Sequence, residues 1–194
     1  MSIMSRDELF TVIAAGKYRG KKLKLPSLTS TRSTKSILKE SYFNTIQFDI
    51  IDEAFVEVFG GSGSMGLEAL SRGASHSYFI EKDTKAFAIL KQNCDMIDSK
   101  RTTCKRADSF EYFEEFLKSF TCRAFFYFDP PFSIREGMDD IYEKVYHLIE
   151  NIPKNRVNLI TIEHMSSYKL PEIIGEYELQ KTKKFGKSSL SYYL

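Results

Sequence analysis

The fold of this chain follows from residues 54–69, which read Ala54-Phe-Val-Glu-Val-Phe-Gly-Gly-Ser-Gly-Ser-Met-Gly-Leu-Glu-Ala69. The first six residues form a short apolar alternation that is typical of a strand, and the glycines after them lead into a helical pattern. Glycine tolerates the backbone angles of a tight turn and leaves room for a ligand beside the main chain. The spacing Gly61-x-Gly63-x-x-Gly66 therefore predicts a site for an adenosine-containing cofactor. An ordinary strand-to-helix turn is the alternative.

The composition indicates a soluble, globular chain. It has 194 residues, of which 42% are hydrophobic and 28% are charged. No apolar run approaches the roughly 18 residues that span a bilayer, and residues 1–6 do not resemble a signal peptide, so we expect a cytoplasmic protein. The three cysteines and three histidines lack the spacing of metal ligands. We therefore expect no metal site and no catalytic thiol.

The positive charge is concentrated near the N-terminus. The net charge is only +2, yet residues 12–44 contain eight basic residues and one acidic residue. Lysine and arginine neutralise phosphates and release counterions, so this segment is predicted to face a polyanion. Within it, two extended pieces at 12–15 and 22–25 flank Gly16-Lys-Tyr-Arg-Gly20, which predicts a hairpin with an aromatic ring and two cations at its tip. Such a tip suits unpaired RNA bases. A solvated charged surface is the alternative.

Strands and helices alternate through the rest of the chain. Strand patterns occur at 54–59, 77–80, 102–107, 124–128 and 157–162, with helical patterns between them. Two further extended pieces, 177–185 and 190–193, predict an antiparallel hairpin at the sheet edge. This order indicates a doubly wound α/β fold, which binds ligands at the carboxyl ends of its strands.

Acidic residues follow two of these strands. Glu81 ends the second strand about twenty residues after the first glycine, where a carboxylate can accept from both hydroxyls of a ribose. Asp83 is the nearby competitor, and an acid that stabilises a helix N-terminus is the alternative for both. Thr84 is expected to cap the next helix. Asp108 and Ser109 end the third strand and should reach the same rim of the sheet.

The fourth strand, residues 124–128, is wholly apolar and leads directly into Asp129-Pro-Pro-Phe132. Two prolines fix the backbone and remove two N–H donors. This rigidity favours a role in which the Asp129 carboxylate and the Pro130 carbonyl meet one amino group. Phe132 would offer its ring to the same place.

Two motifs resemble those of class I S-adenosylmethionine-dependent methyltransferases that act on an exocyclic amine. They are Glu57-x-Phe59-x-Gly61-Ser-Gly63-x-x-Gly66-x-Glu68-Ala69 and Asp129-Pro-Pro-Phe132. More narrowly, the chain resembles the RsmD-type methyltransferases of bacterial small-subunit (16S) ribosomal RNA, which methylate a guanine on N2. The segments that carry this narrower resemblance are 15–23, Arg32-x-Thr34, 43–44, 67–74 and Phe185-Gly186.

The resemblance implies a Rossmann-like fold with a seven-stranded, mostly parallel sheet, helices on both faces, and an antiparallel edge hairpin. A basic RNA-facing extension, residues 1–48, would precede a methyltransferase domain at 49–194. The implied catalytic residues are Asp129, Pro130 and Phe132. The implied cofactor residues are Glu57, Phe59, Gly61, Gly63, Glu81, Asp108 and Ser109. The residues expected to bind RNA are Lys17, Tyr18, Arg19, Lys21, Lys22, Arg32 and Lys35.

The expected function is methyl transfer from S-adenosylmethionine to guanine N2 in ribosomal RNA, within a small-subunit ribonucleoprotein. The motif also permits other amino targets, namely adenine N6 in DNA or RNA and a protein glutamine. A non-catalytic RNA-binding or assembly module is a second alternative, although it would have little need of the rigid Asp129-Pro-Pro-Phe132. A dehydrogenase is a third, but the chain offers no second domain and no catalytic His/Lys arrangement.

Overall fold

The computed structural model describes residues 9–26, 32–131 and 140–194, without the side chains of residues 32–34. The helices are α1 (Arg32–Thr45), α2 (Ser64–Ser71), α3 (Thr84–Asp98), α4 (Ser109–Ser119) and α5 (Ile141–Glu150). The strands are β1 (Phe10–Val12), β2 (Lys22–Lys24), β3 (Ala54–Glu57), β4 (His76–Glu81), β5 (Thr102–Arg106), β6 (Ala124–Phe128), β7 (Val157–Met165), β8 (Ile173–Ile174), β9 (Tyr177–Phe185) and β10 (Ser188–Tyr193).

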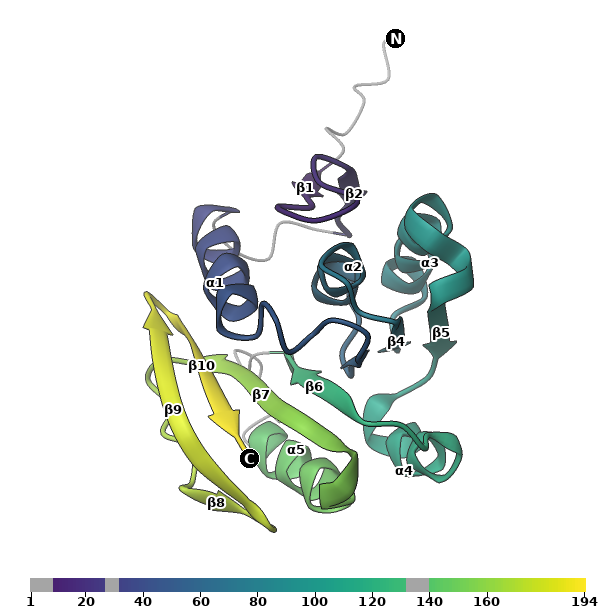
Figure 1. Ribbon diagram of the computed structural model, residues 1–194. Coiled ribbons are helices and arrows are strands. Elements are labelled where there is room, and N and C mark those ends of the chain that lie inside the picture. The colour runs from purple at the N-terminus through teal and green to yellow at the C-terminus, as the bar shows by residue number, and fades with distance from the viewer. Residues whose placement is uncertain (1–8, 27–31, 132–139) are drawn as a thin grey trace, which may run out of the picture.

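A mostly parallel sheet forms the centre of the molecule (Figure 1). Its strand order is β5-β4-β3-β6-β7-β10-β9-β8. The first five strands in that order are parallel, whereas β10 runs antiparallel to both β7 and β9. This arrangement confirms the predicted α/β fold and its antiparallel edge hairpin.

The described residues contain one more strand in this sheet than the seven expected. The additional strand is β8, whose two residues pair with the start of β9. Gly175 has a φ of 56°, in the left-handed region that glycine adopts readily, and it lets the chain reverse between Ile174 and Tyr177. A two-residue strand has too little sequence to show an alternating pattern, so it could not be predicted.

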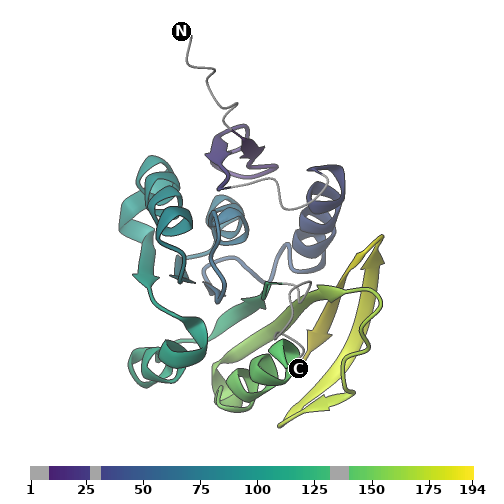
Figure 2. The same cartoon turned by 180° about the vertical axis from the view of Figure 1, so that it is seen from behind.

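Helices cover both faces of the sheet. Figures 1 and 2 show α1, α2 and α3 on one face and α4 and α5 on the other. Strand β6 contributes to both cores: Phe125 and Tyr127 pack on the α1–α3 side, and Phe126 and Phe128 pack on the α4–α5 side. A strand between two layers needs apolar residues at every position, which explains the uninterrupted apolar run.

The N-terminal extension forms the predicted hairpin. Strands β1 and β2 pair antiparallel, with Phe10 opposite Lys24. The first strand begins two residues earlier than the predicted piece at 12–15. Gly16 has a φ of 81°, and a Cβ there would lie 1.8 Å from the Ser71 carbonyl oxygen. Only glycine therefore lets the hairpin approach the end of α2 so closely.

The side chain of Glu68 fastens this hairpin to the rest of the molecule. Its carboxylate is fully buried and accepts the backbone N–H groups of Ala14 (2.8 Å) and Ala15 (3.1 Å). Arg72 Nε donates to it at 2.8 Å, and Lys39 Nζ of α1 lies 3.4 Å away. Two cations and two N–H donors compensate for the desolvation of this charge, and together they join α1, α2 and the hairpin.

The expected domain boundary near residue 48 stays a prediction. Leu38, Tyr42 and Phe43 of α1 pack in the same apolar cluster as Phe55 and Tyr127 of the central sheet. The extension and the sheet thus share one continuous core.

Replacing Glu68 by Ala should lower the free energy of unfolding by about 3–5 kcal/mol, because Lys39 and Arg72 would lose their buried partner. Chemical denaturation measures this change, and hydrogen exchange should show that the amides of Ala14 and Ala15 lose protection. Glu115→Gln, a change of an exposed acid on α4, serves as the control. Equal stability of the two variants would contradict the role given to Glu68.

Candidate active site

A cavity of about 290 Å³ lies at the carboxyl end of the central strands. The end of β3 and the turn after it supply Glu57, Phe59 and Gly61. Asp129 follows β6, and Glu163 lies in β7. Helix α1 and the N-terminal hairpin line the opposite side. The lining residues from these last two elements are Leu9, Phe10, Thr11, Leu25, Pro26, Lys35, Ser36, Leu38 and Lys39. The cavity therefore lies between the sheet and the N-terminal extension.

The glycine turn lines this cavity at residues 60–62, and Gly61 is the most open of its glycines there. Gly61 has a φ of 51°, and a Cβ there would meet no atom within 4 Å. Gly63, with a φ of 77°, does not line the cavity, and a Cβ there would lie 2.6 Å from Leu90. A Cβ on Gly66 would similarly lie 2.4 Å from the ring of Phe79. Gly61 leaves room for a ligand, whereas Gly63 and Gly66 let α2 and α3 pack closely on the sheet.

Glu57 is a buried acid on the wall of the cavity. Its Oε2 accepts the N–H of Gly66 at 2.8 Å, and this bond holds the start of α2 against β3. Burial raises the pKa of Glu57 to about 8. A cation bound beside this carboxyl group would favour its ionised form and lower that pKa. Phe59, two residues further on, lines the same cavity and packs against Phe110 with ring centroids 5.3 Å apart.

The two acids after β4 have different roles. Glu81 accepts the N–H of Gly61 at 2.7 Å through Oε2 and the N–H of Asp83 at 2.7 Å through Oε1. Asp83 accepts from the N–H groups of Lys85 and Ala86, so it is the N-cap of α3. The expected cap, Thr84, is instead the first residue of the helix, because an aspartate side chain reaches these N–H groups readily. Of the two acids, Glu81 is the one in contact with the glycine turn.

Asp108 and Ser109 use their side chains within the protein. Asp108 accepts the N–H of Phe110 as the N-cap of α4 and lies 2.5 Å from Lys82 Nζ. The Ser109 hydroxyl donates to the Val58 carbonyl at 2.5 Å. Neither residue lines the cavity. Their assignment to cofactor binding stays a prediction.

Asp129 forms an ion pair with Lys35 at the end of β6. Lys35 Nζ lies 2.9 Å from Asp129 Oδ2 and 2.7 Å from Glu163 Oε1. Burial alone would lower the pKa of Lys35, but the two carboxylates outweigh it and raise that pKa above its ordinary value. The ammonium therefore bridges the two acids. Pro130 is buried beside them, and Phe132 lies outside the described residues.

Glu163 is a site residue that the sequence analysis did not assign to the site. It lies within β7 and is 1% exposed, and its Oε2 accepts the hydroxyl of Tyr127 at 2.9 Å. Burial and the charge of Asp129 raise the pKa of Glu163 to about 7, while Lys35 opposes the shift. An acid near the carboxyl end of an apolar parallel strand follows the same rule that selected Glu81. That signal was present in the sequence.

The predicted RNA-binding residues do not form one group. Lys17, Arg19, Lys21 and Lys22 are exposed on the hairpin, whereas Lys35 is in the cavity. The side chain of Arg32 is not described. Because these hairpin cations face solvent, they remain available to a polyanion.

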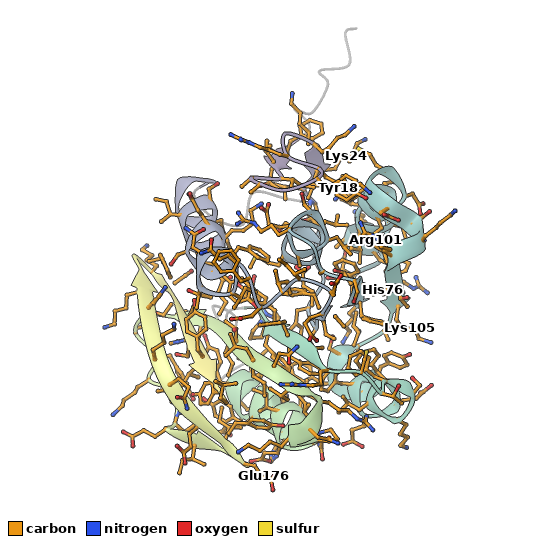
Figure 3. The ribbon with its side chains drawn as sticks, in the orientation of Figure 1. Tyr18, Lys24, His76, Arg101, Lys105 and Glu176 are labelled. Carbon is orange, nitrogen blue, oxygen red and sulfur yellow. The ribbon has the colours of Figure 1, made fainter. Side chains whose placement is uncertain are left out.

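Tyr18 of the hairpin tip is anchored to the protein body. Its hydroxyl donates to Asp98 at 2.9 Å and accepts from Arg101 at 3.1 Å. Figure 3 shows Tyr18 below Lys24 of β2 and above Arg101. The ring is partly buried, so this tyrosine attaches the tip to α3, and its predicted contact with RNA remains to be tested.

Comparisons with known proteins agree with this arrangement. A family model described as "Conserved hypothetical protein 95" matches residues 11–194. The chain belongs to this family. It is 28% identical to the ribosomal RNA small subunit methyltransferase D of Escherichia coli, over 93% of this chain and 88% of that protein. This similarity confirms the predicted resemblance to the RsmD-type methyltransferases.

Solved structures support the same fold. A protein of Escherichia coli provisionally named a methyltransferase has a TM-score of 0.75 and 26% identity, with 95% of this chain and 97% of that chain covered. Another solved protein, provisionally named a methyltransferase and complexed with S-adenosylhomocysteine, has a TM-score of 0.67 at 9% identity. It covers 100% of this chain and 57% of that chain, and at this identity it shows the fold alone.

The raised pKa of Glu57 predicts a pH-dependent stability. Its folded-state value of about 8 lies above the ordinary 4.5, so the folded protein keeps a proton that the unfolded chain loses. The contribution of this group is present below pH 4.5 and is lost as the pH rises through 8, by about 1.4 kcal/mol per pH unit.

Glu57→Gln keeps an acceptor for Gly66 and removes the titration. The free energy of unfolding of the variant, measured by denaturant titration between pH 5 and 8, should therefore fall less steeply than that of the unmodified protein. Parallel curves for the two proteins would show that Glu57 is ionised in the folded state.

Proposed function

We propose that this protein transfers a methyl group from S-adenosylmethionine to the exocyclic N2 amine of a guanine in small-subunit ribosomal RNA. The observation that carries the proposal is the position of Asp129, which begins the Asp129-Pro-Pro motif at the end of β6 and lines the same cavity as Gly61 of the glycine turn. The relative named ribosomal RNA small subunit methyltransferase D supports the substrate class. We further propose that the protein acts in the cytoplasm, on RNA within a small-subunit ribonucleoprotein. In the part of the chain that the structure describes, no helix is long and apolar enough to cross a membrane.

The residues of the cavity fit S-adenosylmethionine. The open side of Gly61 leaves its main chain accessible, and the carboxyl group of Glu57 would meet the amino group of the methionine end. Glu81 does not itself line the cavity, but it is held against Gly61, which does, and it has lone pairs left to accept from the ribose hydroxyls. When bound, the cofactor supplies an electrophilic methyl group on a sulfonium. The surrounding protein must then position a nucleophile in line with it.

Asp129 and Pro130 would orient that nucleophile. An amine on a purine is a poor nucleophile, because its lone pair is delocalised into the ring. When the Asp129 carboxylate and the Pro130 carbonyl each accept one N–H, the lone pair turns toward the methyl carbon, and positioning supplies much of the rate. Transfer would form a nitrogen–carbon bond as the carbon–sulfur bond of the bound cofactor breaks, with the electron pair left on sulfur. The amine then releases one proton to solvent. Phe132 would stack on the extruded base.

Labelled methyl transfer tests the proposal directly. Small ribosomal subunits from cells that lack this protein are incubated with it and with labelled S-adenosylmethionine, and the nucleosides are separated. Label in N2-methylguanosine is the expected result. Label in N6-methyladenosine would establish a different amino target. Cofactor binding without transfer to RNA or protein would favour the assembly module.

Asp129→Ala should abolish methyl transfer and leave cofactor binding nearly unchanged, because the carboxylate acts on the amine. Activity is measured on the same subunits, and cofactor affinity is measured by calorimetry. Asp95→Ala, a change of an exposed acid on α3, is the control. Activity retained by the Asp129 variant would refute the assignment.

The exposed hairpin cations should contribute to RNA affinity through counterion release. Replacing both Lys17 and Arg19 by Gln should weaken binding to 16S RNA and make the slope of log K against log salt shallower, by about 0.7–0.9 for each phosphate that is no longer neutralised. Lys118→Gln on α4, on the other face of the sheet (Figure 1), is the control. An unchanged slope would place the RNA elsewhere.

A further inference from the structure

Three acids line the cavity, Glu57, Asp129 and Glu163, and Glu163 has no part in the reaction described above. Its Oε1 and the Oδ2 of Asp129 both lie within hydrogen-bond distance of the same Lys35 Nζ, at 2.7 Å and 2.9 Å. Two acceptors and one donor therefore converge at one place on the cavity wall. The Tyr127 hydroxyl donates to the other oxygen of Glu163 and fixes the orientation of the carboxylate.

This group of side chains has the polarity that a guanine edge requires. Beside its N2 amine, guanine carries an N1–H donor and then the O6 acceptor. Adenine has an unprotonated N1 beside its N6 amine, and cytosine has an unprotonated N3 beside its N4 amine. A carboxylate next to Asp129 would accept from guanine N1–H, but it would face a lone pair of adenine or cytosine. A buried acceptor opposed to an acceptor is strongly unfavourable.

We infer that Glu163 is a specificity-determining residue that accepts the N1–H of the target guanine, while Asp129 accepts from N2 and Lys35 donates to O6. This inference rests on the proposed function. In the free protein the ammonium of Lys35 bridges the two acids and offsets their charge. Guanine takes over both acceptors with its own N–H groups, and the flexible lysine side chain moves along the same edge to O6.

Burial supports this role for Glu163. Lys35 and the Tyr127 hydroxyl favour the ionised form of Glu163, against the effects of burial and Asp129. In that form, a desolvated carboxylate discriminates more strongly between donors and acceptors than an exposed one, because water cannot take the place of the missing partner. Glu163 is 1% exposed, and on the neighbouring strand β10 it pairs with the apolar Leu190. Among the residues that the structure describes, the charged groups that act on Glu163 are Lys35 from α1 and Asp129 after β6.

The test replaces the target guanosine, once mapped, by 2-aminopurine riboside in reconstituted small subunits. This base keeps the N2 amine but has an unprotonated N1 and no O6. The unmodified protein should methylate guanosine about ten-fold to a hundred-fold faster than 2-aminopurine, as measured by kcat/KM. In Glu163→Gln, the amide can donate to an unprotonated N1, so this ratio should fall by about ten-fold or more.

The controls separate this inference from the proposed function. Glu176→Gln, a change of an exposed acid far from α1 in Figure 3, should leave the ratio unchanged. Lys35→Met removes the proposed O6 donor and should also lower the ratio, which keeps the test usable if Glu163→Gln does not fold. Cofactor affinity reports folding of each variant.

Three outcomes overturn an assignment. Equal losses on both bases in Glu163→Gln would show that Glu163 only supports the structure, and the inference would fail. An unmodified protein that methylates both bases equally well would also overturn the inference. Absence of transfer to guanosine by the unmodified protein would instead overturn the proposed function.

Discussion

The burial of one carboxylate, that of Glu68, makes the active-site cavity possible. A buried charge needs hydrogen-bond donors or opposite charges around it to replace water. For Glu68 these come from N–H groups of the hairpin, from Lys39 of α1 and from Arg72 after α2. The hairpin and α1 supply one wall of the cavity, and the glycine turn supplies the other. If the extension were only tethered, Asp129 would face open solvent. The electrostatics of the site therefore depend on a contact made on α2.

Much of the fold could be predicted because its signals are local. The glycine turn, the apolar run of 124–128 and the two prolines each specify a backbone conformation within a few residues. The parallel strands then bring Glu57, Glu81 and Asp129 to one rim, since strands of this topology end on the same side of the sheet. The assignments of Asp108 and Ser109 used the same rule and stay predictions, because strand position alone does not give the direction of a side chain. Both side chains bond within the protein.

The remaining features of the site arise from contacts between distant residues. Lys35 meets Asp129 and Glu163 across 94 and 128 positions, and no local pattern encodes that meeting. A lysine in a basic segment predicts an exposed cation, yet the packing of α1 on the sheet places this one between two acids. Tyr18 shows the same effect, because its hydroxyl finds Asp98 and Arg101 at the end of α3. The sequence shows how many charged residues a segment contains, but the partners of each charged side chain depend on tertiary packing.

The strand order at the antiparallel edge has a consequence for the way the chain folds during synthesis. Strand β10 lies between β7 and β9, although it leaves the ribosome after both. Until β10 has emerged, β9 has no neighbour through which to join the sheet, and the edge of β7 beside Glu163 stays unpaired. A nascent chain that has completed β3 to β7 thus exposes a sheet edge next to the candidate active site. Such an unpaired edge can pair with another chain until β10 covers it.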